Sequence, residues 1–192
     1  MKKYALIGLA LGLALLLGLA LYLRSEPVAH GIKLPPGSDF VLQSADGPVD
    51  SKTLRGKVLL IYFGYTHCPD VCPASLAAGG QALNALTPAE QAKVRLMMVS
   101  VDPGRDTLQH LKEYTAFFHP QLTGITGSPE EIAALAKAFG AGYIKQPAKA
   151  DGSYAIDHTV STYVIDREGK LVAVLDIGTP TDKLLATVRK YL

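Results

Sequence analysis

Residues 57–73 read KVLLIYFGYTHCPDVCP, an apolar run that leads directly into the only two cysteines of the chain. The apolar part, 57–63, is typical of a strand in the middle of a sheet that is covered on both faces. Cys68 and Cys72 follow with three residues between them. A cysteine pair at the exit of a central strand is a disulfide, a redox couple or part of a metal site.

Outside this stretch, patterns of strands and helices alternate along the chain. The expected elements are a hairpin at 39–50 around Asp46-Gly47, strands at 57–63 and 94–101, helices at 74–86, 107–118 and 128–140, a strand pair at 161–166 and 171–178, and a final helix at 179–192. This order predicts an α/β domain, with a mixed sheet and helices on both of its faces. Gly79 and Gly80 should weaken the first helix by about 1 kcal/mol each relative to alanine.

Two further segments have ordinary structural interpretations. Met97 and Met98 lie within an apolar strand pattern, so we expect them to fill the core. In DPGRDT, residues 102–107, the proline and glycine turn the chain, and Asp106 or Thr107 is expected to cap the helix that follows.

A long uncharged segment opens the chain at residues 4–23, YALIGLALGLALLLGLALYL. As a helix it extends about 30 Å, the thickness of the hydrocarbon core of a bilayer, and it exceeds the ~7–15 apolar residues of a signal peptide. We therefore predict that residues 1–24 are a cytoplasmic N-terminus and a retained transmembrane anchor. Lys2 and Lys3 favour a cytoplasmic N-terminus, which places the remaining chain outside the cytoplasm in a single-pass protein of the cell membrane.

Residues 25–37 are rich in proline and glycine and are interpreted as a linker, so the folded domain is expected at 38–192. Removing Lys2, Lys3 and Arg24 from the count leaves 16 basic and 17 acidic residues, a net charge of −1. This balance gives no indication of nucleic-acid binding.

The spacing of the cysteines bears on their chemistry. A disulfide that closes so short a loop contributes only about 2 kcal/mol, which makes Cys68–Cys72 a weak structural staple. The positive end of the following helix favours thiolates, a condition that suits redox chemistry and metal binding alike. Dithiol oxidoreductases normally use Cys-x-x-Cys, whereas the extra residue here leaves room for an ion. Two thiolates do not complete a metal site, so an imidazole is needed.

The chain offers five histidines as ligands. Three are expected away from the cysteines, in the linker or on the surface: His30, His110 and His119. His67 adjoins Cys68, but neighbouring residues of an extended segment point in opposite directions. His158 precedes a buried strand, where loops at strand ends form the crevice in which sites assemble, and it is the favoured candidate.

Three motifs occur in a fixed order behind the single anchor: GYTHCPDVCP at 64–73, VSVDPGRDT at 99–107 and DHTVSTYVID at 157–166. Together they resemble the Sco (SenC) family of copper-binding assembly proteins of cytochrome c oxidase. The resemblance covers the whole predicted domain. It implies a thioredoxin-like fold, with copper, as Cu(I) or Cu(II), held by Cys68, Cys72 and His158.

Two carboxylates accompany these residues. Ligating histidines usually donate their other ring nitrogen to an acceptor, and Asp157 adjoins His158. Asp70 lies between the cysteines. Both belong to the family motifs, and we expect Asp157 and Asp70 to orient or tune the ligands.

The resemblance implies a non-enzymatic copper metallochaperone that serves the dinuclear copper site of cytochrome c oxidase subunit II, with another extracytoplasmic copper chaperone as a candidate donor. The absence of an Arg- and Ser-rich transit sequence favours a bacterial protein. A membrane-anchored thiol–disulfide oxidoreductase that reduces the cysteines of the oxidase copper site is the alternative. Such enzymes carry a cis-proline before the strand that faces their cysteines, and 157–166 contains no proline. A thioredoxin-like peroxidase is disfavoured, since Thr66 stands two positions before Cys68 rather than three.

Overall fold

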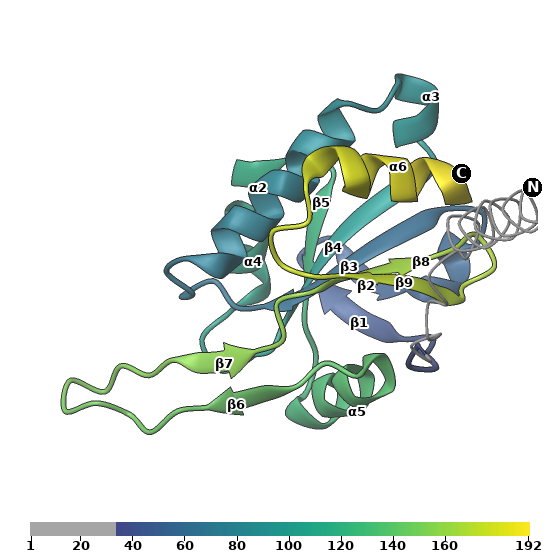
Figure 1. The fold of residues 1–192 in the computed structure, drawn as a ribbon. Helices are drawn as coiled ribbons and strands as arrows, with labels where there is room; N and C mark the ends of the chain where they lie inside the picture. The colour runs from purple at the N-terminus through teal and green to yellow at the C-terminus, as the bar shows by residue number, and fades with distance from the viewer. Residues whose placement is uncertain (1–33) are drawn as a thin grey trace, which may run out of the picture. The chain divides into compact units, whose positions relative to one another are not determined.

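The computed structural model describes residues 34–192, so the predicted anchor and most of the linker lie outside the described residues (Figure 1). Gly37, which was expected to end the linker, already contacts the domain, because its N–H donates to the carbonyl of Ala138 at 3.0 Å. None of the helices described for 34–192 has both the length and the apolar character needed to cross a bilayer.

A five-stranded sheet lies at the centre of the domain, with the strand order β5-β4-β3-β8-β9. Its members are β3 (Val58–Gly64), β4 (Val94–Ser100), β5 (Leu122–Ile125), β8 (Thr162–Ile165) and β9 (Leu171–Leu175). β3, β4 and β5 are parallel, whereas β8 is antiparallel to both β3 and β9. All seven residues of β3 are buried, as expected for the middle strand. The predicted mixed sheet is confirmed, although β5 was not predicted.

Helices cover both faces of this sheet, as predicted (Figure 1). The helices of the described residues are the 3₁₀ helix η1 (Ser51–Leu54) and the α-helices α2 (Val71–Asn84), α3 (Pro88–Gln91), α4 (Leu108–Phe118), α5 (Pro129–Phe139) and α6 (Thr181–Tyr191). α2 and α6 lie over one face and α5 over the other. On the α5 face, the Phe139 ring lies 5.9 Å from that of Phe63 and 5.6 Å from that of Tyr163, centroid to centroid.

The best-defined helix ends follow from local sequence. Ser128 accepts a hydrogen bond from the backbone N–H of Glu131 and Gly140 adopts φ 66°, so α5 begins and ends where its capping box and glycine predict. Thr107 caps α4 by accepting from the N–H of His110. Asp106, the other cap candidate, does not cap α4, because its carboxylate is buried in a different network described below.

Helix α2 begins three residues earlier than predicted, so that Cys72 lies in its first turn. Its glycine pair permits close packing. A Cβ on Gly79 would lie 2.7 Å from Cδ2 of Leu96, and one on Gly80 would lie 2.8 Å from the carbonyl oxygen of Phe118. The intrinsic cost of two glycines is therefore offset by close approach of α2 to β4 and to the end of α4.

Three of the antiparallel strand pairs join strands that follow one another in the sequence. β1 (Val41–Ser44) and β2 (Gly47–Asp50) form the predicted hairpin, and β8–β9 form the second. The third, β6 (Tyr143–Lys145) with β7 (Ile156–His158), was not predicted. It carries a long connecting segment away from the sheet (Figure 1) and ends at His158, which pairs with Tyr143.

Candidate metal centre

Three ligating side chains converge beyond the end of β3. Cys68 comes from the loop after β3, Cys72 from the first turn of α2 and His158 from the end of β7. The ligand atoms of all three lie within 4.8 Å of one another, and Sγ of Cys72 is 3.3 Å from Nε2 of His158. Both cysteines are free and buried, while His158 is half-buried. The structure thus brings together the three residues predicted as ligands.

Gly64 makes room for this arrangement. A Cβ at that position would lie 2.9 Å from Sγ of Cys72 and 2.8 Å from the ring of Tyr62. Both distances are shorter than real Cβ contacts, so any larger residue would displace the thiol or the ring. Glycine at the end of β3 therefore allows the backbone to pass directly beside Cys72.

The environment of Cys72 disfavours a free thiolate. Its place in the first turn of α2 exposes it to the positive end of the helix dipole, which was expected to lower the thiol pKa. Burial outweighs this effect and raises the pKa of Cys72 to about 12. A coordinated cation reverses the balance, because thiols deprotonate when they bind a metal.

His158 presents the nitrogen that a metal requires. Its Nδ1 lies 3.0 Å from the carbonyl oxygen of Thr159. Since a carbonyl only accepts hydrogen bonds, Nδ1 carries the proton, which leaves the lone pair on Nε2 directed at Cys72. Burial lowers the pKa of His158 and favours the neutral ring that ligates metals.

Neither of the two predicted accessory carboxylates forms a hydrogen bond with the His158 ring. Asp157 is exposed and accepts a hydrogen bond from Nε2 of Gln146 at 2.5 Å. The carbonyl of Thr159 occupies the acceptor position expected for Asp157, which acts on His158 only as a nearby charge that raises its pKa. Asp70 is exposed at the start of α2 and makes no side-chain capping bond, so its tuning role stays a prediction.

Two tyrosines that the sequence analysis did not single out surround the imidazole. The rings of Tyr62 and Tyr65 meet that of His158 edge-on, with centroids 6.0 and 5.8 Å away. The Tyr65 hydroxyl accepts a hydrogen bond from the N–H of Ile156 at 3.2 Å. The Tyr62 hydroxyl is buried without a hydrogen-bond partner among the described residues. The only sequence signal for this pair was its position on either side of Gly64.

The DPGRDT segment has a larger role than capping. The buried carboxylate of Asp106 accepts from the backbone N–H of Thr66 at 3.0 Å, from the Thr66 hydroxyl at 2.6 Å and from the Ser100 hydroxyl at 2.6 Å. These bonds fix the loop that carries Cys68 to the end of β4. Three satisfied acceptor contacts offset the cost of burying this charge.

Residues from the same segment also hold the β6–β7 hairpin. Nε of Arg105 donates to Asp102 at 2.5 Å, and its Nη1 donates to the carbonyl of Tyr154 at 3.0 Å. The Tyr154 hydroxyl donates to Asp102 at 2.8 Å. One short segment therefore contacts both the cysteine loop and the hairpin that bears His158.

The donor set fits a soft metal ion. Two thiolates and one imidazole suit Cu(I), and a further oxygen ligand would accommodate Cu(II). Metal–sulfur and metal–nitrogen bonds of about 2.3 and 2.0 Å require donor atoms a few ångströms apart. The three ligand atoms, all within 4.8 Å of one another, satisfy that requirement with small shifts.

Comparison with known proteins agrees with this geometry. A family model described as SCO1/SenC matches residues 31–192. The chain belongs to the SCO1/SenC family.

Several members of this family are closely similar to the chain. The mitochondrial SCO1 homolog 1 of Arabidopsis thaliana is 38% identical over 160 residues, which cover 81% of this chain and 48% of the relative. An SCO2-like protein of Rickettsia conorii is 34% identical over 196 residues, 98% of this chain and 95% of the relative. The chain thus spans about half the length of its plant relative and nearly all of the rickettsial one.

A solved structure of the family confirms the fold class. The structure of Bradyrhizobium japonicum ScoI with copper bound has a TM-score of 0.75 and 39% sequence identity, and the match covers 82% of this chain and 99% of that one. The thioredoxin-like α/β fold implied by the sequence motifs is therefore borne out for the described domain.

The remaining described histidines lie outside the ligand group. Nδ1 of His67 contacts the Thr66 hydroxyl at 3.1 Å. His110 is exposed, as predicted, and its Nε2 lies 3.1 Å from the same hydroxyl. The prediction for His119 is wrong, because this residue is buried and its Nδ1 accepts from the N–H of Gln121 at 3.0 Å. His30 precedes the described residues.

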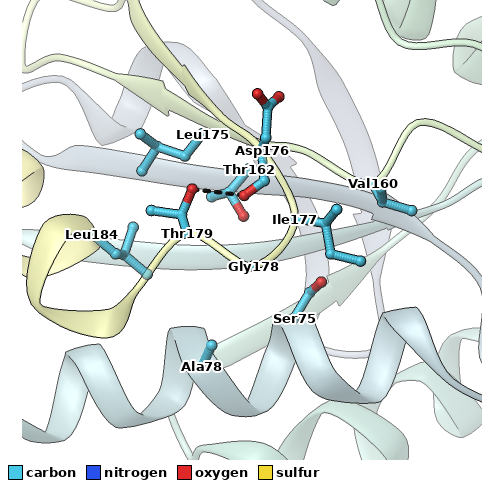
Figure 2. Close-up of a pocket in the computed structure, with 10 residues that line it drawn as sticks. All are labelled: Ser75, Ala78, Val160, Thr162, Leu175, Asp176, Ile177, Gly178, Thr179 and Leu184. Atoms are coloured by element: carbon cyan, nitrogen blue, oxygen red, sulfur yellow. Dashed lines mark hydrogen bonds between the residues drawn. The ribbon is translucent and has the colours of Figure 1, made fainter.

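A small cavity of ≈ 40 Å³ lies between α2 and the segment that joins β9 to α6. Figure 2 shows its lining, in which Thr179 Oγ1 donates to the carbonyl of Asp176 at 2.7 Å. The Asp176 carboxylate also accepts from the Ser161 hydroxyl at 3.3 Å. A single carboxylate is the only strong metal ligand among the lining residues, and the volume suits one or two waters. The cavity is therefore a packing gap.

Proposed function

We propose that this protein binds copper through Cys68, Cys72 and His158 and takes part in the assembly of cytochrome c oxidase. The convergence of two thiols and one imidazole within 4.8 Å is the main support. The copper-bound structure of the family member ScoI gives independent support for the metal. Copper in this proposal is cargo, which the protein receives and passes on.

The finer role is that of a metallochaperone for the dinuclear copper site of subunit II. A site of three protein ligands, one of them half-buried, leaves a side from which an incoming ligand can exchange the metal. Another extracytoplasmic copper chaperone is the proposed donor. Residues 1–24 would anchor the protein in the cell membrane, with 25–37 as linker and 38–192 outside the cytoplasm.

Copper loading tests the binding proposal. The full-length chain, purified in detergent, should bind one Cu(I) when both thiols are reduced and lose most of that capacity when they are oxidised or when Cys72 is replaced by serine. In cells that lack the gene, the wild-type chain should restore oxidase activity and Cys72→Ser should not. Equal copper loading by the reduced and the oxidised protein would refute the proposal.

The membrane proposal has its own test. The mature protein should retain residues 1–24, and a protease that cannot cross the membrane should digest the domain only from the outer side. Mass spectrometry that finds a mature N-terminus between residues 24 and 37 would refute a retained anchor.

A thiol–disulfide oxidoreductase is the second candidate, because both sulfurs are free and within 4.8 Å of each other. A dithiol reductase depends on Cys68 and Cys72 but needs no imidazole. His158→Ala should therefore leave disulfide exchange intact while it impairs oxidase copper assembly. Normal copper assembly in His158→Ala cells, with loss of assembly in Cys72→Ser cells, would favour the reductase.

A further inference from the structure

Arg105, Asp102 and Tyr154 form a closed set of contacts where the segment that connects β6 to β7 leads into β7. Each pair within the set is hydrogen-bonded, through Arg105 Nε to Asp102, Arg105 Nη1 to the Tyr154 carbonyl and the Tyr154 hydroxyl to Asp102. The Asp102 side chain is only 6% exposed and that of Arg105 21% exposed. Because both side chains are largely shielded from solvent, this ion pair holds a more fixed geometry than an exposed surface pair does.

Two cationic side chains also pack against the aromatic ring of Tyr154. The guanidinium carbon of Arg105 lies 3.5 Å from the ring centroid, and Nζ of Lys145 lies 3.7 Å from it. Lys145 belongs to β6, so these cation–π contacts join both arms of the hairpin to the β4–α4 connection.

This anchored segment leads directly to His158. Two residues after Tyr154, the N–H of Ile156 donates to the hydroxyl of Tyr65, which lies three residues before Cys68. In a strand, residues two apart face the same side, so buried Ile156 and His158 share a face while Asp157 points away. The hairpin is therefore attached at 154 and 156, and the next residue on that face is His158.

We propose that Arg105 is a positioning residue that holds Nε2 of His158 within ligand distance of Cys72. This inference rests on the proposed copper function, because it concerns the same site. Arginine suits the task, since its planar guanidinium reaches Asp102 and the Tyr154 carbonyl at once in a fixed geometry. A lysine ammonium would keep the charge beside Asp102 but not both directed bonds.

The two oxidation states of copper should respond differently to loss of this contact. Both thiolates remain when the hairpin loosens, so Cu(I) binding is largely retained. Cu(II) is the state that imidazole particularly suits, and its affinity should fall. Arg105 thus tunes the preference of the site between the two states without touching the metal.

The test compares Arg105→Lys with Arg189→Lys in the full-length chain. Arg189 is a matched control on α6, at the other end of the domain from the hairpin (Figure 1), because it too pairs with a carboxylate, Glu90, and a carbonyl, that of Ala85. Cu(II) affinity is measured by competition titration, and nitrogen coordination by electron paramagnetic resonance. Arg105→Lys should weaken Cu(II) binding about tenfold and reduce the nitrogen hyperfine signal, as outer ligand-orienting contacts typically do. Arg189→Lys should change neither.

A double variant separates positioning from a general structural effect. In the His158→Ala background, Arg105→Lys should cause no further loss of Cu(II) affinity, because the residue that it positions is gone. An undiminished loss in that background would overturn the proposal. So would unchanged affinity and hyperfine signal in Arg105→Lys itself.

Tyr154→Phe provides the gentler variant should Arg105→Lys fail to fold. It removes only the hydroxyl that donates to Asp102, and it should weaken Cu(II) binding in the same direction by a few-fold. Unchanged affinity would count against the proposal. Failure of the proposed function is distinct, since it would appear as equal Cu(II) affinity in the wild type and in His158→Ala.

Discussion

Sγ of Cys72 and Nε2 of His158 lie 3.3 Å apart, although the two residues are 86 positions apart in the sequence. Because the Thr159 carbonyl fixes the His158 proton on Nδ1, the Cys72 thiol is the donor in this contact. A copper ion bound between sulfur and nitrogen would replace that one proton. Metal uptake should therefore release the Cys72 proton, whose pKa burial raises to about 12.

Gly64→Ala should disturb the centre through packing alone. Its new methyl group would lie 2.9 Å from Sγ of Cys72, so the thiol must shift, and overpacking of this kind costs roughly 1–3 kcal/mol of unfolding free energy. Copper affinity should fall at least tenfold. Gly104→Ala is the control, since its nearest neighbour would be Asp102 Oδ1 at 4.0 Å. Competition titration measures the copper affinity of both variants, and urea unfolding measures their stability. Equal copper affinity and equal stability of Gly64→Ala and Gly104→Ala would contradict the prediction.

Removing the hydroxyl from Tyr62 or from Tyr65 should have opposite consequences. Tyr65→Phe leaves the buried N–H of Ile156 without its acceptor and should lower the free energy of unfolding by about 1–3 kcal/mol. Tyr62→Phe removes a buried hydroxyl that has no described partner, so stability should stay the same or rise. Chemical denaturation of the two variants measures the difference. A larger loss for Tyr62→Phe than for Tyr65→Phe would be inconsistent with these contacts.

His119 should make the fold sensitive to acid. Burial lowers its pKa below the usual 6.5, so the folded state holds it neutral, with Nδ1 accepting from Gln121. The contribution of His119 to the free energy of unfolding is then complete above about pH 6.5, and it is lost as the pH falls through the lowered pKa. His119→Asn keeps an acceptor but removes the titration, so its unfolding midpoint should fall less between pH 7 and pH 5. His158 is present in both proteins, so its effect on the pH dependence cancels when the two are compared. Parallel pH profiles of the wild type and His119→Asn would show that His119 does not cause the acid sensitivity.

The sequence was most informative where local signals agreed with the fold. The apolar run 57–63 became the fully buried β3, and Ser128, Glu131 and Gly140 set the ends of α5. By contrast, β5 has only four residues and β6 only three, two of them exposed, too short to show a periodic pattern. These strands exist because their neighbours in space pair with them.

The sequence likewise indicated some features of the candidate site and not others. Residue type, spacing and the family motifs indicated Cys68, Cys72 and His158. The acceptor for His158 proved to be a backbone carbonyl rather than Asp157, and backbone direction cannot be inferred from residue type. The contact of Arg105 with Tyr154 spans 49 residues, and no local pattern signals it.

X-ray absorption spectroscopy of the copper-loaded, full-length chain tests the central claim most directly, because it counts the sulfur and nitrogen atoms bound to the metal. For the wild type we expect copper coordinated by two sulfurs and one imidazole nitrogen. In His158→Ala the nitrogen should disappear while both sulfurs remain. Identical sulfur and nitrogen coordination in the wild type and His158→Ala would contradict the assignment of Cys68, Cys72 and His158 as one copper site.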